Sequence, residues 1–141
     1  MRKRRKSREL ALQVLYHWDV TGQDAAKTLS QLQEHFSPGP ERDEFAERIV
    51  LGVLNHREEI DRLIEEVSEN WRLDRMTVID RNLLRLATFE LRYCDDILPK
   101  VALNEAIDLG KRFGSEESGS FINGILDRIR KETVRKSISS N

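Results

Sequence analysis

The sequence predicts an all-α protein with about seven helices, arranged as two helical sets packed into one compact domain. Apolar residues recur at intervals of three and four along most of the chain, which is the spacing of one helical face. Seven glycines and three prolines in 141 residues are too few for the many turns of a β-sandwich. No segment alternates apolar and polar residues for long enough to indicate a strand.

The N-terminal half of the chain predicts helices separated by clear stop signals. The first is expected over about residues 7–20, before Gly22, with these apolar positions: Ala11, Val14, Leu15 and Trp18. Asp24 is placed to cap a second helix that ends near Phe36. The breaker at residues 37–40 places Pro40 at the first position of a third helix. The fourth helix carries one narrow apolar stripe: Ile60, Leu63, Ile64, Val67 and Trp71.

A change of pattern near residues 72–74 divides the helices into two sets, residues 7–71 and 75–133. The first helix of the second set, over about residues 75–93, has so many apolar positions that only a thin polar strip remains. We therefore expect it to lie at the centre of the fold. Thr77 and Asp80 have the spacing of a capping box at its start.

The last two helices are bounded by Pro99 and by a glycine- and serine-rich loop. A helix over about residues 101–113 follows Pro99, and Gly114 is expected to end it in the left-handed conformation. Ser115 is placed to cap the last helix. Beyond Arg130 the chain turns polar, so we expect residues 134–141 to form a fraying tail.

Charge is distributed unevenly along the chain. The whole chain has a formal net charge of −1. Residues 1–8 hold six basic side chains and no acidic one: Arg2, Lys3, Arg4, Arg5, Lys6 and Arg8. The remainder has 18 basic and 25 acidic residues, a balance of −7. A basic N-terminal arm on an acidic body is typical of proteins that contact nucleic acid or another acidic surface. Alternatively, the arm is a tail that only increases solubility.

Several function classes lack their signatures. Cys94 is the single cysteine and the three histidines lie far apart, so we expect no disulfide, metal site or cofactor. No glycine-rich phosphate loop and no nucleophile elbow is present, so we expect no catalytic activity. No apolar run reaches the length of a membrane span, and a cytoplasmic location is expected.

The basic arm and the first helix together predict contact with single-stranded RNA. If this helix extends back toward Arg5, then Arg5, Arg8, Leu12 and Tyr16 lie along one side. Guanidinium groups bind phosphate oxygens in pairs of hydrogen bonds, and a tyrosine can stack on an unpaired base. Tyr16 is alternatively a core aromatic. No basic recognition helix for duplex DNA is evident.

Two further features leave alternatives open. Phe121 stands at the start of the last helix, where it can stack on a base, but it also falls on the apolar stripe of that helix. Arg81, Arg85 and Arg92 form a basic strip on the otherwise apolar helix over residues 75–93. This strip is either a solvated edge or a surface for a partner.

Five segments, in this order, resemble the NusB family of bacterial transcription antitermination proteins. They are ALQVLY at residues 11–16 after the basic arm, DRNLLRLATFEL at 80–91, LNEAI at 103–107, KRFG at 111–114 and FINGILD at 121–127. The resemblance spans essentially the whole chain. It implies two small helical bundles without catalytic activity. It also implies binding to the boxA element of ribosomal-RNA transcripts together with NusE, the small-subunit ribosomal protein S-ten, within an RNA polymerase antitermination complex.

The resemblance also implies roles for individual residues. Arg4, Arg5, Lys6 and Arg8 match the arginine-rich RNA-binding arm of the family. Tyr16, Arg85 and Phe121 match positions along the same RNA-facing side. Asp80 and Glu117 match acidic positions near the RNA and partner surfaces.

Other functions remain compatible with the sequence. The same helical module resembles an N-terminal domain of some ribosomal-RNA cytosine methyltransferases, in which it would still bind RNA. A second alternative is a protein-interaction module without direct RNA contact. Some members of the family also self-associate, so a homodimer is a further expectation.

Overall fold

The computed structural model describes residues 2–36, 42–69 and 71–139, and in these ranges it contains helices and no strands. The elements in chain order are α1 (Arg2–Thr21), α2 (Ala25–Phe36), α3 (Glu44–Asn55), α4 (Arg57–Val67), the short 3₁₀ helix η1 (Leu73–Arg75), α5 (Val78–Tyr93), α6 (Pro99–Phe113) and α7 (Ser118–Ser139). The predicted all-α fold with seven α-helices is confirmed over the described residues. None of these helices is long and apolar enough to cross a membrane.

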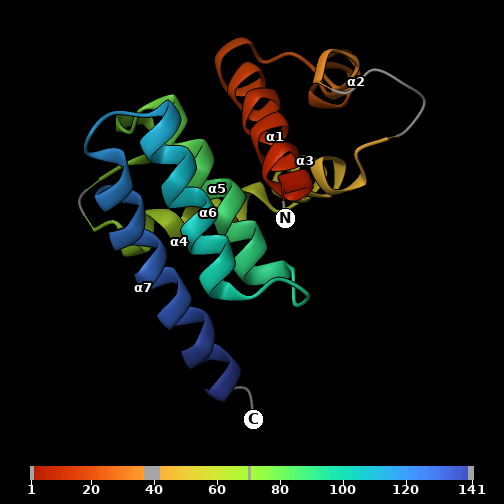
Figure 1. Ribbon diagram of the computed structural model, residues 1–141. Coiled ribbons are helices and arrows are strands. Elements are labelled where there is room, and N and C mark those ends of the chain that lie inside the picture. The colour runs from red at the N-terminus through yellow and green to blue at the C-terminus, as the bar shows by residue number, and fades with distance from the viewer. Residues whose placement is uncertain (1, 37–41, 70, 140–141) are drawn as a thin grey trace.

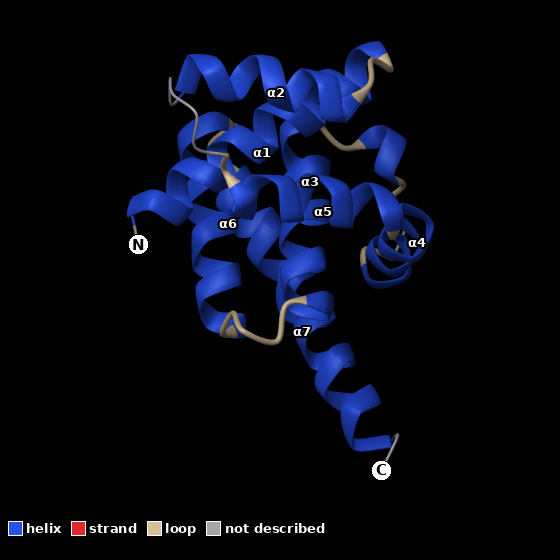
Figure 2. Cartoon of the chain, turned by 90° about the vertical axis from the view of Figure 1, so that its right-hand side faces the viewer, coloured by secondary structure: helices blue, strands red, loops and turns tan. Residues whose placement is uncertain are grey.

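The helices form two groups that meet along α1 and α5 (Figure 1). One group contains α1, α2 and α3, and the other contains α4, α5, α6 and α7. Helix α4 packs mainly on α5 and α7 rather than on α3. The chain therefore passes from one group to the other at the α3–α4 junction near His56, and not at residues 72–74 as the sequence predicted. The last turns of α7 project beyond the other helices (Figure 2).

Helix α5 occupies the centre of the molecule, as predicted. It packs against α1, α3, α4, α6 and α7. Every residue from 82 to 90 is buried, including several polar ones. An all-round buried helix needs apolar residues on nearly every face, which explains its thin polar strip. The polar side chains that it does bury require partners inside the protein.

Short-range stop and cap signals determine several helix ends. Gly22 follows α1 with φ of 74°, a left-handed conformation that glycine adopts without a Cβ clash. Asp24 Oδ1 accepts a hydrogen bond from the Ala26 N–H at the start of α2, at 3.1 Å. Thr77 Oγ1 accepts one from the Asp80 N–H at the start of α5, also at 3.1 Å. The predictions for Gly22 and Asp24 are confirmed, and so is the Thr77 half of the predicted capping box.

The first and third helices begin at different residues from those predicted. Helix α1 begins at Arg2, so the basic segment is its first two turns rather than a separate arm. Helix α3 begins at Glu44, with Asp43 as its N-cap. The Asp43 side chain accepts a hydrogen bond from the Ala46 N–H at 3.0 Å, which fixes this start. Pro40, the predicted start, lies outside the described residues.

The fourth helix is shorter than its apolar stripe suggested. It ends at Val67, and Glu69 adopts φ of 60°, which a continuing right-handed helix cannot accommodate. Trp71 therefore leaves the stripe and lies exposed on the surface, whereas Ile60 and Ile64 are buried as expected.

The last loop and the last helix also differ from expectation. Gly114 has φ of −98° and ψ of −154°, so it is not left-handed. Glycine is required there because a Cβ would overlap the Ser118 side chain. Ser115 does not cap the last helix, which begins at Ser118, whose Oγ accepts a hydrogen bond from the Ser115 N–H at 2.9 Å. Helix α7 continues to Ser139, so residues 134–139 are helical rather than a frayed tail.

Candidate nucleic-acid interface

The first two turns of α1 present exposed basic side chains on a helix. Lys3, Arg4, Arg5 and Lys6 are all exposed. Among the described residues, the two lysines form no ion pair, whereas both arginines contact acids from a distant part of the chain. Because these residues belong to a continuous helix that packs on the core, their backbone positions are defined before any ligand arrives.

Arg5 is held by two acidic side chains of α6. Its Nε donates to Glu105 Oε2 at 2.9 Å, and its Nη2 donates to Asp108 Oδ2 at 3.0 Å. The hydrogen bond that Arg5 donates to Glu105, together with the negative charge of Glu105, raises the pKa of Arg5. The Arg5 side chain remains about half exposed, at 46%. It can therefore exchange these carboxylates for phosphate oxygens.

Arg4 lies beside a second acidic position, in the turn before α6. Its Nη2 lies 3.7 Å from Asp96 Oδ2, and its guanidinium lies 4.5 Å from the centre of the Phe45 ring. Arg48 of α3 binds the same Asp96 carboxylate with both terminal nitrogens, at 2.6 and 3.0 Å. Asp96 therefore joins the start of α1 to α3. The pKa of Asp96 is lowered to about 2, mainly by the hydrogen bond from Arg48.

Arg8 differs from its predicted place in the exposed arm. Its side chain is 2% exposed and that of Glu90, on α5, is fully buried. The guanidinium binds Glu90 through Nη2–Oε1 at 2.6 Å and Nε–Oε2 at 2.9 Å. Burial raises the pKa of Glu90, and the hydrogen bond from Arg8 opposes this rise. In this arrangement Arg8 does not reach solvent, because α1 packs this side of the helix on α5.

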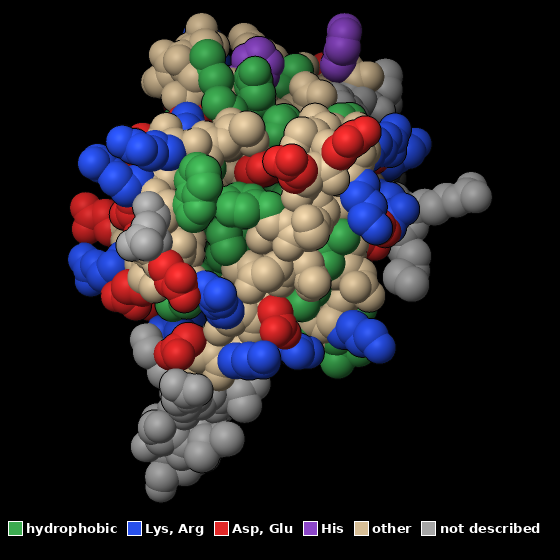
Figure 3. Space-filling view, turned by 90° about the vertical axis from the view of Figure 1, so that its left-hand side faces the viewer, with side chains coloured by type: hydrophobic (Ala, Val, Ile, Leu, Met, Phe, Trp, Pro, Cys, Tyr) green, Lys and Arg blue, Asp and Glu red, His purple; other side chains and the backbone are tan. Residues whose placement is uncertain are grey.

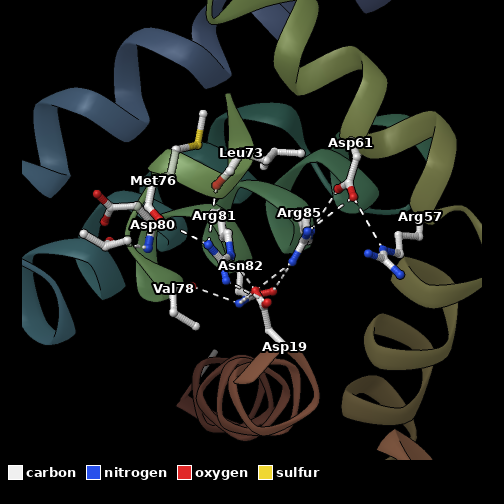
Figure 4. Close-up of polar contacts among 11 residues, drawn as sticks. Asp19, Arg57, Asp61, Leu73, Met76, Val78, Asp80, Arg81, Asn82 and Arg85 are labelled. Atoms are coloured by element: carbon white, nitrogen blue, oxygen red, sulfur yellow. Dashed lines mark hydrogen bonds and ion pairs between the residues drawn. The ribbon is translucent and has the colours of Figure 1, made fainter. Parts of the chain in front are cut away.

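Arg85 likewise lies inside the protein, in a polar network among α1, α4 and α5 (Figure 4). It donates from Nη1 to Asp19 Oδ2 at 3.0 Å and from Nε to Asp61 Oδ1 at 2.8 Å. Arg81 Nε donates to the same Asp19 oxygen at 2.6 Å. Burial acts to raise the pKa of Asp19, but hydrogen bonds from Arg81 and Asn82 outweigh it and the pKa is lowered.

These contacts change the interpretation of the basic strip on α5. Arg85 is buried and Arg81 is partly buried, so neither forms the solvated edge or partner surface that the sequence suggested. Asp19 stands near the C-terminal end of α1 and Arg8 near its beginning. Two buried or partly buried ionic contacts therefore hold α1 on α5, one toward each end of α1.

Tyr16 lies on the surface, on the exposed side of α1. Its side chain is 40% exposed, which favours the surface position over the core position that the sequence left open. It borders a cavity of about 220 Å³ between α1 and the ends of α5 and α6, lined by Glu9, Leu12, Gln13, Tyr16, His17, Ile79 and Phe113. Arg112 contacts two of the lining residues, because its Nη1 binds Glu9 at 2.6 Å and its guanidinium lies 5.0 Å from the Phe113 ring centre. Phe113 lies 97 residues after Tyr16 in the chain, so only the fold brings the two rings to the same cavity.

Phe121 is partly buried near the start of α7. It packs against the edge of the core, and its ring meets the Trp71 ring edge to face, with centres 6.4 Å apart and planes at 75°. Phe121 is therefore neither fully in the core nor fully on the surface, the two positions that the sequence left open.

On one face of the molecule, hydrophobic side chains gather in the middle and charged side chains of both signs lie around them (Figure 3).

The two acidic candidates lie at the starts of helices. Asp80 is buried in the first turn of α5, and its Oδ1 has no hydrogen-bond partner among the residues that the structure describes. Glu117 is exposed just before α7, and its backbone oxygen accepts a hydrogen bond from the Phe121 N–H at 3.0 Å. Among the described residues, no three His, Cys, Asp or Glu side chains come together in a way that could hold a metal ion.

Comparison with known proteins gives one consistent family. The NusB family model matches residues 5–131. Transcription antitermination protein NusB of Myxococcus xanthus is 52% identical over 130 residues, 89% of this chain and 93% of that protein. The structure of T. maritima NusB has a TM-score of 0.84 at 40% identity and covers 92% of this chain and 91% of that chain. A structure of the antitermination factors NusB and NusE in complex with dsRNA has a TM-score of 0.85 at 32% identity, covering 94% of this chain and 98% of that chain.

Proposed function

Because the chain belongs to the NusB family, we propose that it is a transcription antitermination factor. It binds boxA RNA of ribosomal-RNA transcripts together with NusE and supports processive transcription by RNA polymerase. The observation that carries the RNA-binding part is the exposed basic start of α1 on a body that is otherwise acidic. Membership of the family supports the partner and the biological process, since a relative of this chain occurs in complex with NusE and dsRNA.

The proposed RNA contacts are a subset of the residues singled out in the sequence. Arg4, Arg5 and Lys6 are exposed and can bind phosphate oxygens, and Tyr16 and Phe121 offer partly exposed rings to unpaired bases. Asp80 and Glu117 remain proposed neighbours of the RNA or of NusE.

Arg8 and Arg85 receive a different role in this proposal. Their guanidinium groups are buried and bound to carboxylates. If Arg8 reached RNA, Glu90 would lose its cation, and if Arg85 reached RNA, Asp19 and Asp61 would each lose one of theirs. A buried charge without a partner is strongly destabilising. We therefore assign both residues to holding α1 and α5 in place, which sets the position of the exposed contacts.

The acidic partners of Arg5 compete with RNA for the same guanidinium group. Glu105 and Asp108 must give up Arg5 when a phosphate binds it. Ion pairs at exposed sites contribute little to folding stability, about 0–1 kcal/mol, so replacing these carboxylates with a phosphate costs little free energy. The double variant Glu105→Gln with Asp108→Asn should therefore bind RNA more tightly than the wild type, because Arg5 is released in advance.

A salt titration of RNA affinity tests the phosphate contacts. Each phosphate neutralised on single-stranded RNA contributes a slope of about −0.7 to the logarithm of affinity against the logarithm of salt concentration. Contacts from Arg4, Arg5 and Lys6 predict about −2 in total. Replacing all three with alanine should make the slope less negative by about 2, whereas Lys27→Ala, an exposed lysine on α2, should leave it unchanged. The titration uses boxA RNA with NusE present.

The same titration separates this proposal from its alternative. A protein-interaction module without RNA contact would bind NusE normally, and adding boxA RNA would change nothing. That outcome would refute the RNA-binding proposal.

A further inference from the structure

We propose that Trp71 and Phe121 form a two-ring stacking site for unpaired RNA bases, with Trp71 as the outer ring. This inference rests on the proposed RNA-binding function. It adds Trp71, which the sequence placed on the apolar stripe of the fourth helix. The occupant is a single-stranded nucleotide, whose base stacks on an aromatic ring and whose phosphate binds a nearby guanidinium group.

Exposure of the indole ring is the first observation. Trp71 is 55% exposed, although a tryptophan used for packing hides most of its large apolar surface. Its nearest aromatic neighbour is Phe121, at 6.4 Å between ring centres. The two residues are 50 positions apart in the chain, so the fold alone brings them together. Phe121 anchors one side of the indole to the edge of the core.

The backbone that carries Trp71 is held by hydrogen bonds rather than by burial of the ring. The Trp71 N–H donates to the Ser68 oxygen at 3.2 Å, and Ser68 Oγ donates to the Trp71 oxygen at 2.7 Å. Ser68 is itself buried. Leu73 N–H donates to Glu65 Oε2 at 3.2 Å and fixes the next turn. These hydrogen bonds tie the Trp71 backbone to the end of α4, so the exposed ring needs less ordering when a base binds it.

Two exposed arginines near Trp71, Arg72 beside it in the chain and Arg128 on α7, supply the phosphate contacts. Arg128 Nη1 donates to the Val67 oxygen at 2.8 Å and pairs with Glu69 at 3.2 Å, so it lies beside the loop that carries Trp71. Arg72, the next residue, is largely exposed and pairs with Asp74 at 3.3 Å. Both are surface ion pairs of low energy, so a phosphate can replace the carboxylate in either.

The angle between the rings selects single-stranded RNA over a duplex. Planes at 75° cannot both stack on two bases that remain parallel and adjacent, as they are in a double helix. They can stack on two bases that are splayed apart, which only an unpaired strand allows. The site therefore favours nucleotides in a loop or an extended strand.

Tryptophan fluorescence and affinity measured together test this inference. In a Trp18→Phe background, Trp71 is the only tryptophan, since the chain has two. Titration with boxA RNA in the presence of NusE should quench Trp71 emission with the same midpoint as RNA binding. Trp71→Ala should weaken RNA binding by about 5- to 150-fold, and Trp71→Phe should restore most of it. Leu51→Ala, an exposed apolar residue on α3, is the matched control and should leave affinity unchanged.

The possible outcomes separate the inference from the function on which it rests. If Trp71→Ala binds RNA like the wild type while alanine at Arg4, Arg5 and Lys6 weakens binding, the stacking site is refuted and the proposed function stands. If Trp71 emission responds fully to NusE alone and RNA adds no change, Trp71 is a protein contact and the inference is again refuted. If the wild type does not bind RNA, both proposals fail.

Discussion

Arg8 offers the sharpest test of how the buried charges of this protein act. The predicted change is Arg8→Ala, which removes the only cation within hydrogen-bonding distance of Glu90, among the described residues. The Glu90 side chain is fully buried, so water cannot take the place of the lost guanidinium group. Breaking a buried ion pair from one side costs about 3–5 kcal/mol of folding stability.

That loss is large compared with the stability of a domain of this size. Folded domains are stable by about 5–15 kcal/mol, so Arg8→Ala removes roughly a fifth or more of the total. At about 2–4 °C of melting temperature per kcal/mol, the melting temperature should fall by about 6–20 °C. The double variant Arg8→Met with Glu90→Leu removes both charges and keeps side chains of similar volume. It should recover most of the stability, because no unpaired charge remains.

Thermal melting and RNA titration distinguish the structural role of Arg8 from a phosphate contact. If the double variant is well folded, its RNA affinity should lie within about twofold of the wild type and its salt slope should be unchanged. Lys6→Ala, on the exposed side of α1, is the control and should melt within about 2 °C of the wild type. This reasoning would be refuted by an Arg8→Ala variant that melts like the wild type but whose salt slope is less negative by about 0.7, the value of one phosphate contact.

Two further predictions concern packing and pH. Gly52→Ala should lower stability by about 1–3 kcal/mol, because the new Cβ would overlap the Phe89 ring. Gly124→Ala, in α7 with nothing within 4 Å, should instead raise it by about 0.5–1 kcal/mol, and equal melting temperatures for the two variants would contradict the packing. The lowered pKa of Asp96 stabilises the folded protein above pH about 4, and this contribution is lost as pH falls toward about 2. In Arg48→Gln an NMR titration of the Asp96 carboxyl should show its pKa rising toward 3.8, and an unchanged value would exclude Arg48 as its cause.

The amino-acid sequence by itself determined the helices and several of their ends. Gly22, Asp24 and Thr77 act on backbone groups at most a few residues away, so their effect is visible in the local sequence. The thin polar strip of α5 likewise predicted its central place, because a helix without a polar face has to be buried on every side. The uneven charge also located the exposed basic residues at the start of the chain.

Only the tertiary structure decided which polar and aromatic side chains are exposed. Arg5 and Arg8 look equivalent in the sequence, yet one is half exposed and the other is bound to Glu90, 82 residues away. Trp71 fits the spacing of a buried stripe, but α4 ends before reaching it. Exposure depends on how α1 is rotated against α5 and on where a distant partner lies. Those relations arise from packing between helices, which the periodicity of one helix does not contain.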